Sequence, residues 1–229
     1  QQTYERFLKI CPKEHIYIVT NRQYVPLVQQ QLPGLPGTQI LGEPTRKNTA
    51  PCVAYAANKL VSFDPDAAMI IAPSDHIVLQ EDVFVRRIEQ ALRAVEEKNL
   101  FVTLGIVPSR PDTGYGYIQY TDEMLAEEVH KVKTFTEKPT VAVAKDFLES
   151  GDYLWNAGIF VWKASTILKA FQTYLPEMYE VFAEGRAVYN TPGENAFIDK
   201  VYPFCSAISI DYGIMEKVSN GGVIPSDFG

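Results

Sequence analysis

The sequence predicts an α/β fold with a mostly parallel, doubly wound central sheet and a smaller antiparallel subdomain. Two observations lead to this prediction. Through the first half of the chain, short apolar runs alternate with segments whose apolar residues recur at helical spacing, which is typical of strands and helices around a parallel sheet. From residue 111 onward the pattern changes to alternating polar and apolar residues, as in antiparallel strands with one solvated face.

The first half can be divided into elements in order along the chain. The strand-like segments are apolar on both faces, which indicates burial between helices. Thr49 can cap the helix that follows it, and the first turn of a helix tolerates Pro51. The expected order is an amphipathic helix carrying Tyr4, Phe7, Leu8 and Cys11 on one face, strand 15–20, helix 22–32, strand 38–42, helix 50–63, strand 67–73, helix 81–98 and strand 101–107.

The second half predicts a different arrangement. Its expected elements are strands 114–120 and 128–139, helix 140–150, strand 157–162, and helices 164–174, 176–184 and 194–201. We expect these to form a subdomain that leans on the sheet. Because no low-complexity linker or internal repeat marks a boundary, we expect residues 1–229 to form a single domain with two halves, 1–110 and 111–229.

Composition narrows the function. The 229 residues carry a formal net charge of −7 and contain no Lys/Arg-rich run, which disfavours general nucleic-acid binding. Small anions remain possible ligands, because backbone amides and a few cations can hold a phosphate on an acidic protein.

The cysteines at positions 11, 52 and 205 form no C-x-x-C pair, so neither a disulfide framework nor a zinc site is indicated. With no signal peptide and no apolar stretch near the ~20 residues of a membrane span, we expect a cytoplasmic protein without a membrane partner.

Two strand ends carry candidate ligand-binding residues. "GEPTRKNTAPC" (42–52) follows one strand and opens a helix, where amides and the helix dipole favour anions or polar ligand edges. Asp75 and His76 follow another strand, and open α/β sheets hold ligands beyond the carboxyl ends of their strands. Asp75 could hold Mg²⁺, which takes one or two carboxylates together with substrate phosphates. Taken alone, each feature is explained as well by a helix cap or a polar turn.

Three later segments carry further candidates. "PDTGYGYI" (111–118) would let the backbone approach a sugar or phosphate closely, or would simply form a hairpin turn. In "TEKP" (136–139), Glu137 and Lys138 would leave a regular strand on opposite faces unless a break at Pro139 aims both inward. A glutamate there could accept sugar hydroxyls while the lysine meets a phosphate as a point charge. "LWNAGIFVW" (154–162) places Asn156 just before a buried strand, with Trp155 as a core residue.

The order of these segments is more specific than any one of them. "EPTRKNTAP", "APSDH", "LGIVPSRPDTGYGYI", "FTEKP", "WNAGIFVWKA" and "SIDYGIMEK" follow one another across residues 43–217. This series resembles the bacterial mannose-1-phosphate guanylyltransferases (GDP-mannose pyrophosphorylases) of the sugar nucleotidyltransferase superfamily. The resemblance implies a Rossmann-like three-layer α/β/α nucleotidyltransferase fold of the GT-A-like type, with a nucleotide-binding half (1–110) and a sugar-phosphate-binding half (111–229).

The resemblance also implies a reaction. GTP and α-D-mannose 1-phosphate would give GDP-mannose and pyrophosphate with Mg²⁺, by in-line attack of the sugar phosphate on the α-phosphorus of GTP. Such chemistry depends on positioning and charge neutralisation, so no nucleophilic side chain is expected. A homodimer is a further expectation.

The resemblance assigns site residues by motif. Asp75 would be a metal ligand and Lys138 would meet the sugar phosphate. "EPTRKNTAP" would border the guanine. From the chemistry of the base we infer that Glu43 could accept hydrogen bonds from N1–H and N2–H of guanine, although backbone carbonyls could serve instead. Asp211 would support the sugar or the metal, or would only cap the following helix. The nucleotide-binding set is Glu43, Asn48, Thr49, Ala50, Ser74 and Asp75, and the sugar-phosphate set is Tyr115, Gly116, Glu137, Lys138, Asn156 and Asp211.

Two expected parts of the family pattern do not occur in the sequence. Its glycine-rich strand–loop would precede Gln1, and its second metal-binding Asp, in a Trp-Ser-Asp-Val/Leu-Gly motif, would follow Gly229. Asp227 is near that place but does not match the motif. We therefore expect a piece of a longer polypeptide.

Two alternative functions stay open. One is another sugar nucleotidyltransferase that uses UTP or dTTP with glucose 1-phosphate, and the other is a non-catalytic nucleotide-sugar-binding protein.

Overall fold

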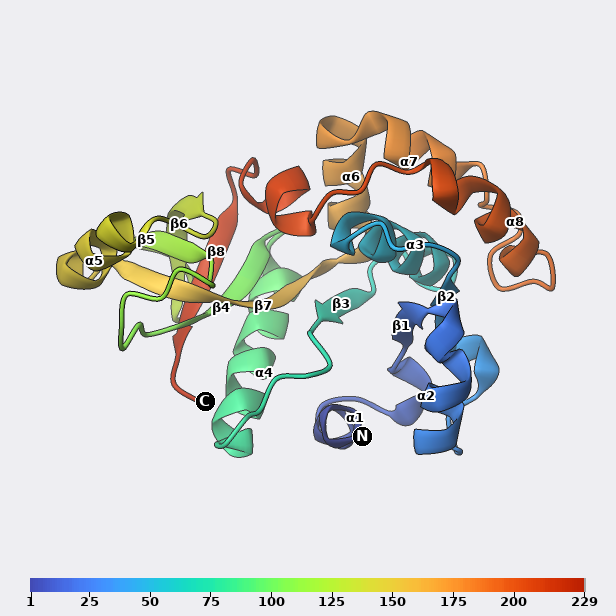
Figure 1. The fold of residues 1–229 in the computed structure, drawn as a ribbon, viewed down its shortest axis with the longest axis horizontal. Coiled ribbons are helices and arrows are strands. Elements are labelled where there is room, and N and C mark those ends of the chain that lie inside the picture. The colour runs from blue at the N-terminus through green and yellow to red at the C-terminus, as the bar shows by residue number, and fades with distance from the viewer. Residues whose placement is uncertain (229) are drawn as a thin grey trace. The chain divides into compact units, whose positions relative to one another are not determined.

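A computed structural model describes residues 1–228, and these form two compact units, each assembled from two stretches of chain (Figure 1). The first unit contains Gln1–Ala67 and Ala164–Lys217. The second contains Ala68–Lys163 and the residues from Val218 onward. Gly229, the last residue of the predicted 1–229 domain, lies outside the described residues.

The first unit combines a small parallel sheet with a group of helices. Strands β1 (Ile18–Asn21) and β2 (Ile40–Glu43) pair in parallel, with Ile18 opposite Ile40. Between them lie the 3₁₀ turn η2 (Arg22–Tyr24), helix α2 (Val25–Gln31) and the turn η3 (Gly37–Gln39). The other elements are α1 (Gln2–Phe7), η1 (Lys13–His15), α3 (Thr49–Val61), α6 (Ala164–Tyr174), α7 (Pro176–Ala183), α8 (Glu194–Val201), η4 (Tyr202–Phe204) and the π-helical turn η5 (Asp211–Met215).

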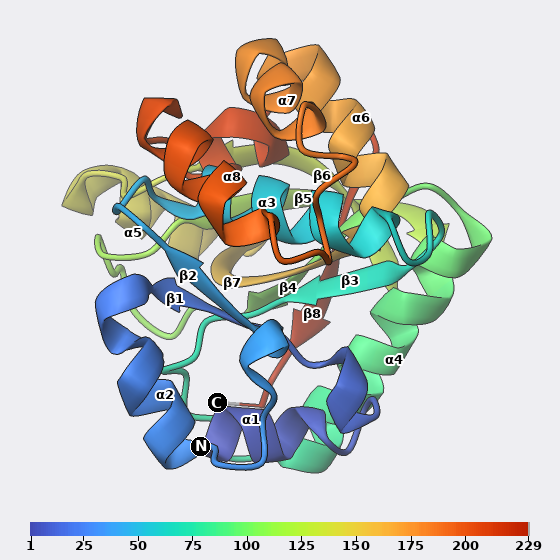
Figure 2. The ribbon, with the colours of Figure 1, turned by 90° about the vertical axis from the view of Figure 1, so that its right-hand side faces the viewer.

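Helix α3 is the central helix of the first unit, and it packs against α6 and α7 (Figure 2). Its alanines at 50, 54, 56 and 57 are all buried, and small side chains let neighbouring helices come close. Near its other end, Lys59 forms a buried ion pair with Glu194 of α8, with 2.7 Å between Nζ and Oε2. The hydroxyl of Tyr55 donates to the same carboxylate. These contacts fix α3 against the rest of the unit.

The second unit is built on one six-stranded sheet. The strands are β3 (Ala68–Ile71), β4 (Phe101–Ile106), β5 (Tyr117–Ala126), β6 (Val129–Thr136), β7 (Tyr153–Lys163) and β8 (Gly221–Ser226), in the order β3-β7-β4-β8-β6-β5. Because β5 also pairs with β7, the last five strands of that order close on themselves. Helices α4 (Glu81–Glu97) and α5 (Val141–Ser150) complete the unit. Helix α4 packs on β7 and β4 through a buried stripe that includes Phe84, Ile88 and Ala91.

The prediction of an α/β fold is confirmed. The prediction of a mostly parallel sheet is wrong for the described strands. In the six-stranded sheet only β4 and β8 pair in parallel. The difference arises because β7 inserts antiparallel between β3 and β4, which would otherwise be expected as parallel neighbours. Strand β7 also begins at Tyr153, earlier than expected, and this extension pairs with β5. Local periodicity shows that a strand is buried, but it does not show which strands lie beside it.

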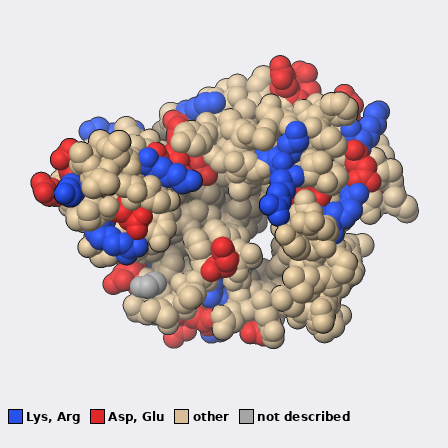
Figure 3. All heavy atoms as spheres, in the orientation of Figure 1, with Lys and Arg blue, Asp and Glu red and all other residues tan. Residues whose placement is uncertain are grey.

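The antiparallel strands expected in the second half agree with the structure. The alternating segments pair as the antiparallel strands β5 and β6. The visible face of each unit carries both basic and acidic side chains, in small groups among the other residues (Figure 3). Among the described residues, none of the helices has both the length and the apolar character needed to cross a bilayer.

Candidate functional site

In the first unit, the predicted nucleotide-binding segment connects β2 to α3. Asn48 is the N-cap of α3: its φ is +66° and its side-chain Oδ1 accepts a hydrogen bond from the Thr49 amide at 2.9 Å. This corrects the expectation that Thr49 is the cap. Asparagine is one of the few residues that tolerates a positive φ, because its short polar side chain can bond locally.

The N-terminus of α3 is already bonded within the first unit. The Ala50 amide donates to the Ile208 carbonyl at 3.0 Å, and the Thr49 Oγ1 accepts from the Ile210 amide at 2.8 Å. Pro51 has no amide hydrogen. The first amides of this helix are therefore not available to an anion, contrary to the expectation from the sequence. What the segment offers a ligand is the turn before the helix.

Glu43, the last residue of β2, begins that turn. The buried Tyr202 hydroxyl donates a hydrogen bond to its Oε1. Burial raises the pKa of Glu43, and the hydrogen bond from Tyr202 partly offsets this rise. Cys52 lies nearby in α3, and its pKa is raised to about 12 by burial and by the charge of Glu43. The sequence analysis missed Tyr202 because nothing local to "KVYPF" indicates a partner 159 positions away.

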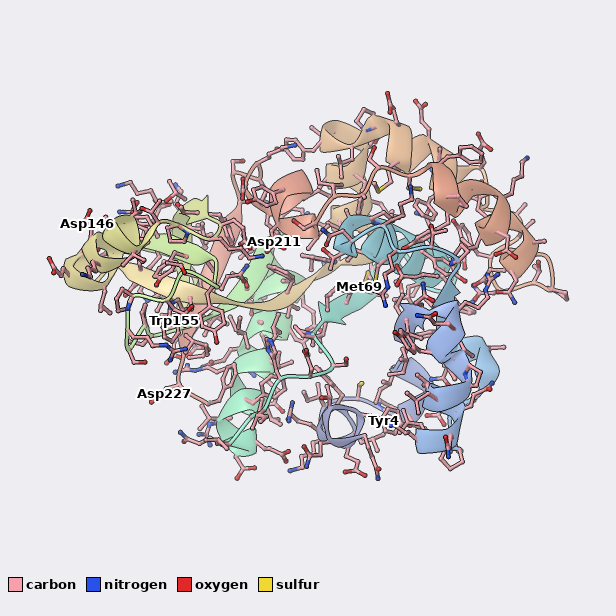
Figure 4. The ribbon with its side chains drawn as sticks, in the orientation of Figure 1. Tyr4, Met69, Asp146, Trp155, Asp211 and Asp227 are labelled. Atoms are coloured by element: carbon pink, nitrogen blue, oxygen red, sulfur yellow. The ribbon has the colours of Figure 1, made fainter. Side chains whose placement is uncertain are left out.

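Asp211 also belongs to the first unit. It is the first residue of η5 and not its cap, which is Ile210 (Figure 4). Its carbonyl accepts from the Glu216 amide at 3.0 Å. Because the adjacent residue Ile210 is bonded to Thr49, Asp211 is held next to the start of α3.

In the second unit, three predicted sugar-binding residues come together. The Asn156 amide, on β7, donates to the Gly116 carbonyl at 2.8 Å. A Cβ placed on Gly116 would lie 2.5 Å from Oε2 of Glu137 and 3.5 Å from the Cβ of Asn156. A side chain at position 116 would therefore occupy the place of the Glu137 carboxylate. We call Gly116, Glu137 and Asn156 the β7 cluster.

Lys138 lies beside the β7 cluster. Its φ is +44°, which breaks the alternation of strand β6 just past its end. As a result its Nζ lies 3.8 Å from Oε1 of Glu137, although adjacent residues in a regular strand point to opposite faces. The ammonium group is largely exposed, with 65% of the side chain accessible. The β7 cluster and Lys138 together therefore present a carboxylate, an amide and an accessible cation.

Two aromatic residues, Tyr115 and Trp155, directly precede Gly116 and Asn156 of the β7 cluster in the sequence, and their rings are in contact. The rings of Tyr115 and Trp155 have centroids 5.1 Å apart, and the Arg110 guanidinium lies 5.2 Å from the Trp155 ring centre. Arg110 is paired with Asp112 at 2.7 Å, and the Gly114 amide donates to Asp112 at 2.8 Å. The amide of Gly114 and then Arg110 lower the pKa of Asp112. These contacts order the loop that presents Tyr115 and Gly116. Trp155 is a buried core residue, as expected from the sequence, whereas the sequence analysis did not single out Arg110.

Asp75 follows β3, two residues after Pro73. A Cβ on Gly158, whose φ is +65°, would lie 3.5 Å from Cγ of Pro73, and the Gly158 amide donates to Oδ1 of Asn156 at 2.9 Å. The turn that begins at Pro73 therefore starts close to the β7 cluster. Asp75 and His76 are exposed. In the part of the chain that the structure describes, no three His, Cys, Asp or Glu side chains gather as a metal site. A single exposed carboxylate still fits Mg²⁺, which takes its other ligands from phosphates and water.

The predicted site residues thus fall into two groups. The first unit holds Glu43, Asn48, Thr49, Ala50 and Asp211, and the second holds Ser74, Asp75, Tyr115, Gly116, Glu137, Lys138 and Asn156. Within each unit, residues from distant motifs are brought into contact.

Comparison with known proteins assigns the family. Residues 1–195 match the family described as "Nucleotidyl transferase". The chain belongs to the nucleotidyl transferase family. It is 37% identical over 224 residues to "Alginate biosynthesis protein AlgA" of Pseudomonas aeruginosa, covering 97% of this chain and 45% of that protein. It is 36% identical to "Mannose-1-phosphate guanylyltransferase" of Sinorhizobium fredii, covering 92% of this chain and 42% of that protein. This nucleotidyl transferase chain therefore spans about half the length of the curated relatives it matches.

Solved structures agree on the fold. A structure described as "mannose-1-phosphate geranyltransferase" from Thermus thermophilus matches with a TM-score of 0.88 and 28% identity, covering 100% of this chain and 64% of that one. A "mannose-6-phosphate isomerase" from Helicobacter pylori matches with a TM-score of 0.83 and 23% identity, covering 99% of this chain and 88% of that one, and shows the fold alone.

Proposed function

We propose that this nucleotidyl transferase chain transfers GMP from GTP to α-D-mannose 1-phosphate, giving GDP-mannose and pyrophosphate. The observation that carries the proposal is the β7 cluster with Lys138 beside it, which presents a carboxylate, an amide and a cation close together. Relatives named for this activity, at 32% and 36% identity, support the choice of substrates. The finer architecture, a Rossmann-like three-layer fold of the GT-A-like type, is part of the same proposal.

The β7 cluster would bind the sugar phosphate. Glu137 would accept hydrogen bonds from mannose hydroxyls, and the Asn156 amide would donate and accept further ones. The missing side chain at Gly116 makes room for the Glu137 carboxylate, which would face the sugar from there. The Lys138 ammonium would meet the phosphate as a mobile point charge. Tyr115 would cover the sugar with its ring, since aromatic side chains offer a large apolar face.

The other predicted residues would bind the nucleotide. Glu43 and the turn through Asn48, Thr49 and Ala50 would border guanine, and Ser74 and Asp75 would lie by the phosphates. In this scheme residues 1–110 serve the nucleotide and residues 111–229 the sugar phosphate, with Asp211 supporting the sugar or the metal.

The chemistry would be a single displacement. A phosphate oxygen of the sugar forms a bond to the α-phosphorus, and the bond from that phosphorus to the oxygen bridging to the β-phosphate breaks. Pyrophosphate leaves with that electron pair. Mg²⁺, held by Asp75, would supply neutralisation of the phosphate charge. Lys138 would hold the attacking phosphate in line, so that catalysis depends on positioning and electrostatics.

The test is pyrophosphate release by the full-length gene product with Mg²⁺, measured across four nucleoside triphosphates and several hexose 1-phosphates. Activity that peaks with GTP and mannose 1-phosphate supports the proposal. A peak with UTP or dTTP and glucose 1-phosphate replaces it with the related transferase. No release with any pair, from a folded protein that still binds GDP-mannose, replaces it with a nucleotide-sugar-binding role.

A further inference from the structure

A buried phenol holds the strand-end carboxylate of the first unit. Tyr202 begins η4 directly after α8, and its side chain is 0% exposed. Its hydroxyl donates to Oε1 of Glu43, at the end of β2. The Tyr202 ring packs edge-on against Phe182 of α7, with centroids 5.9 Å apart. Both the position and the direction of the hydroxyl are therefore fixed by the packing of the unit.

Glu43 lacks the partner that usually accompanies a half-buried carboxylate. No lysine or arginine lies within ion-pair distance of it in residues 1–228, although Lys59 neutralises Glu194 in the same unit. Removing a charge from water is unfavourable unless the charge is hydrogen-bonded or paired. The hydroxyl of Tyr202 is the group that makes ionised Glu43 tolerable here. A half-buried carboxylate that has no cation beside it can still accept hydrogen bonds from donors on a ligand.

The remaining acceptor positions suit guanine. An ionised carboxylate has about four lone-pair sites on its two oxygens. Tyr202 uses one site on Oε1, so each oxygen can still accept one further hydrogen bond. Guanine presents two adjacent donors, N1–H and N2–H. Adenine presents an acceptor at N1, and hypoxanthine keeps N1–H but lacks the N2 amino group.

We propose that Tyr202 is a positioning residue for base selection, and that it orients the Glu43 carboxylate to accept N1–H and N2–H of guanine together. This inference rests on the proposed function, since it assumes that GTP is the nucleotide and that Glu43 contacts its base. Tyr202 acts through Glu43 and touches no substrate itself. Its contribution should therefore appear in the choice between bases, with no effect on the use of the sugar phosphate.

The test compares GTP with ITP in the full-length protein. Tyr202→Phe keeps the ring and its packing while removing the hydroxyl. We expect its kcat/KM for GTP to fall by about tenfold or more, the size of one hydrogen bond to a charged group. The preference for GTP over ITP should shrink by a similar factor, because a carboxylate free to rotate gains less from the second donor. The KM for mannose 1-phosphate should not change.

Tyr189→Phe is the matched control. Tyr189 is 4% exposed, belongs to the same unit, and donates its hydroxyl to the Phe182 carbonyl at 2.8 Å. Removing that hydroxyl also removes a buried hydrogen bond but leaves Glu43 untouched. We expect it to lower the unfolding temperature without changing the ratio of GTP to ITP use.

A second variant covers the case in which Tyr202→Phe does not fold. Glu43→Asp keeps the charge but draws the carboxylate back by one methylene from the Tyr202 hydroxyl, so it should also reduce the preference for GTP over ITP. An unchanged preference in a folded Tyr202→Phe protein, or in Glu43→Asp, overturns the inference while leaving the proposed function intact. If the wild-type protein prefers another nucleotide to GTP, the proposed function itself fails.

Discussion

One added methyl group at Gly116 should disable the proposed sugar site while leaving the second unit folded. In Gly116→Ala the new Cβ would lie 2.5 Å from Oε2 of Glu137 and 3.6 Å from its Cδ. Non-bonded heavy atoms prefer separations of about 3.5 Å or more, so the carboxylate oxygen must move by about 1 Å. The far end of a side chain can make this move without disturbing the backbone, so the fold should survive.

The kinetic consequence follows from that displacement. A shift of about 1 Å in a positioning group can lower the rate by about 100-fold, which corresponds to about 2.7 kcal/mol of transition-state free energy. We expect kcat/KM for mannose 1-phosphate to fall by that amount. The KM for GTP should stay within about threefold of the wild-type value, because the base contacts lie on other elements.

The assay is pyrophosphate release at varied mannose 1-phosphate, with thermal unfolding recorded for each variant. Gly34→Ala is the control, since a Cβ at Gly34 meets nothing within 4 Å. The double variant Gly116→Ala/Glu137→Asp, whose shorter carboxylate avoids the new methyl group, tests the mechanism by recovering part of the loss. Wild-type kinetics in a folded Gly116→Ala protein would refute the placement of the sugar at this cluster.

Three further predictions concern other parts of the chain. Asp75→Asn should abolish pyrophosphate release with Mg²⁺ while leaving circular dichroism unchanged, and normal turnover would remove Asp75 from the metal site. Lys138→Ala should raise the KM for mannose 1-phosphate far more than that for GTP, and equal losses would contradict its assignment to the sugar phosphate. Lys59→Met leaves buried Glu194 without its cation, so the free energy of unfolding in urea should fall by about 3 kcal/mol. A change below about 1 kcal/mol would show that the pair is solvated.

Much of the local structure could be predicted from the sequence because its signals are local. The helix that contains Phe84 and Ile88 shows its buried stripe as a 3.6-residue period, and the antiparallel hairpin shows its solvated face as alternation. The position of β7 could not be predicted in this way. Which strands lie beside it depends on pairing with segments far away in the chain, for example Thr103 opposite Phe160. Periodicity carries no information about such partners.

The candidate site also depends on contacts between distant residues, which local sequence patterns do not predict. The order of the motifs pointed to Glu137, Lys138 and Asn156, and the structure brings the first and last of these to one glycine. It did not point to Tyr202, because a hydrogen bond to a residue 159 positions away leaves no local pattern. Nor could it show that Lys138 has a positive φ, which depends on the chain path after β6.

The start of α3 shows how weak motifs become one site. Ala50 donates to the Ile208 carbonyl and Thr49 accepts from the Ile210 amide, so the first motif in the sequence and the last are joined by two hydrogen bonds. Each motif alone reads as a helix start with a polar residue. When the two motifs are joined, the amide of Ala50 is occupied and no longer available to an anion. The same contacts place Asp211 next to the turn that follows Glu43. With these amides occupied, the turn before the helix suits a base edge better than the helix start suits a phosphate, and the role proposed for Tyr202 and Glu43 requires a base edge there.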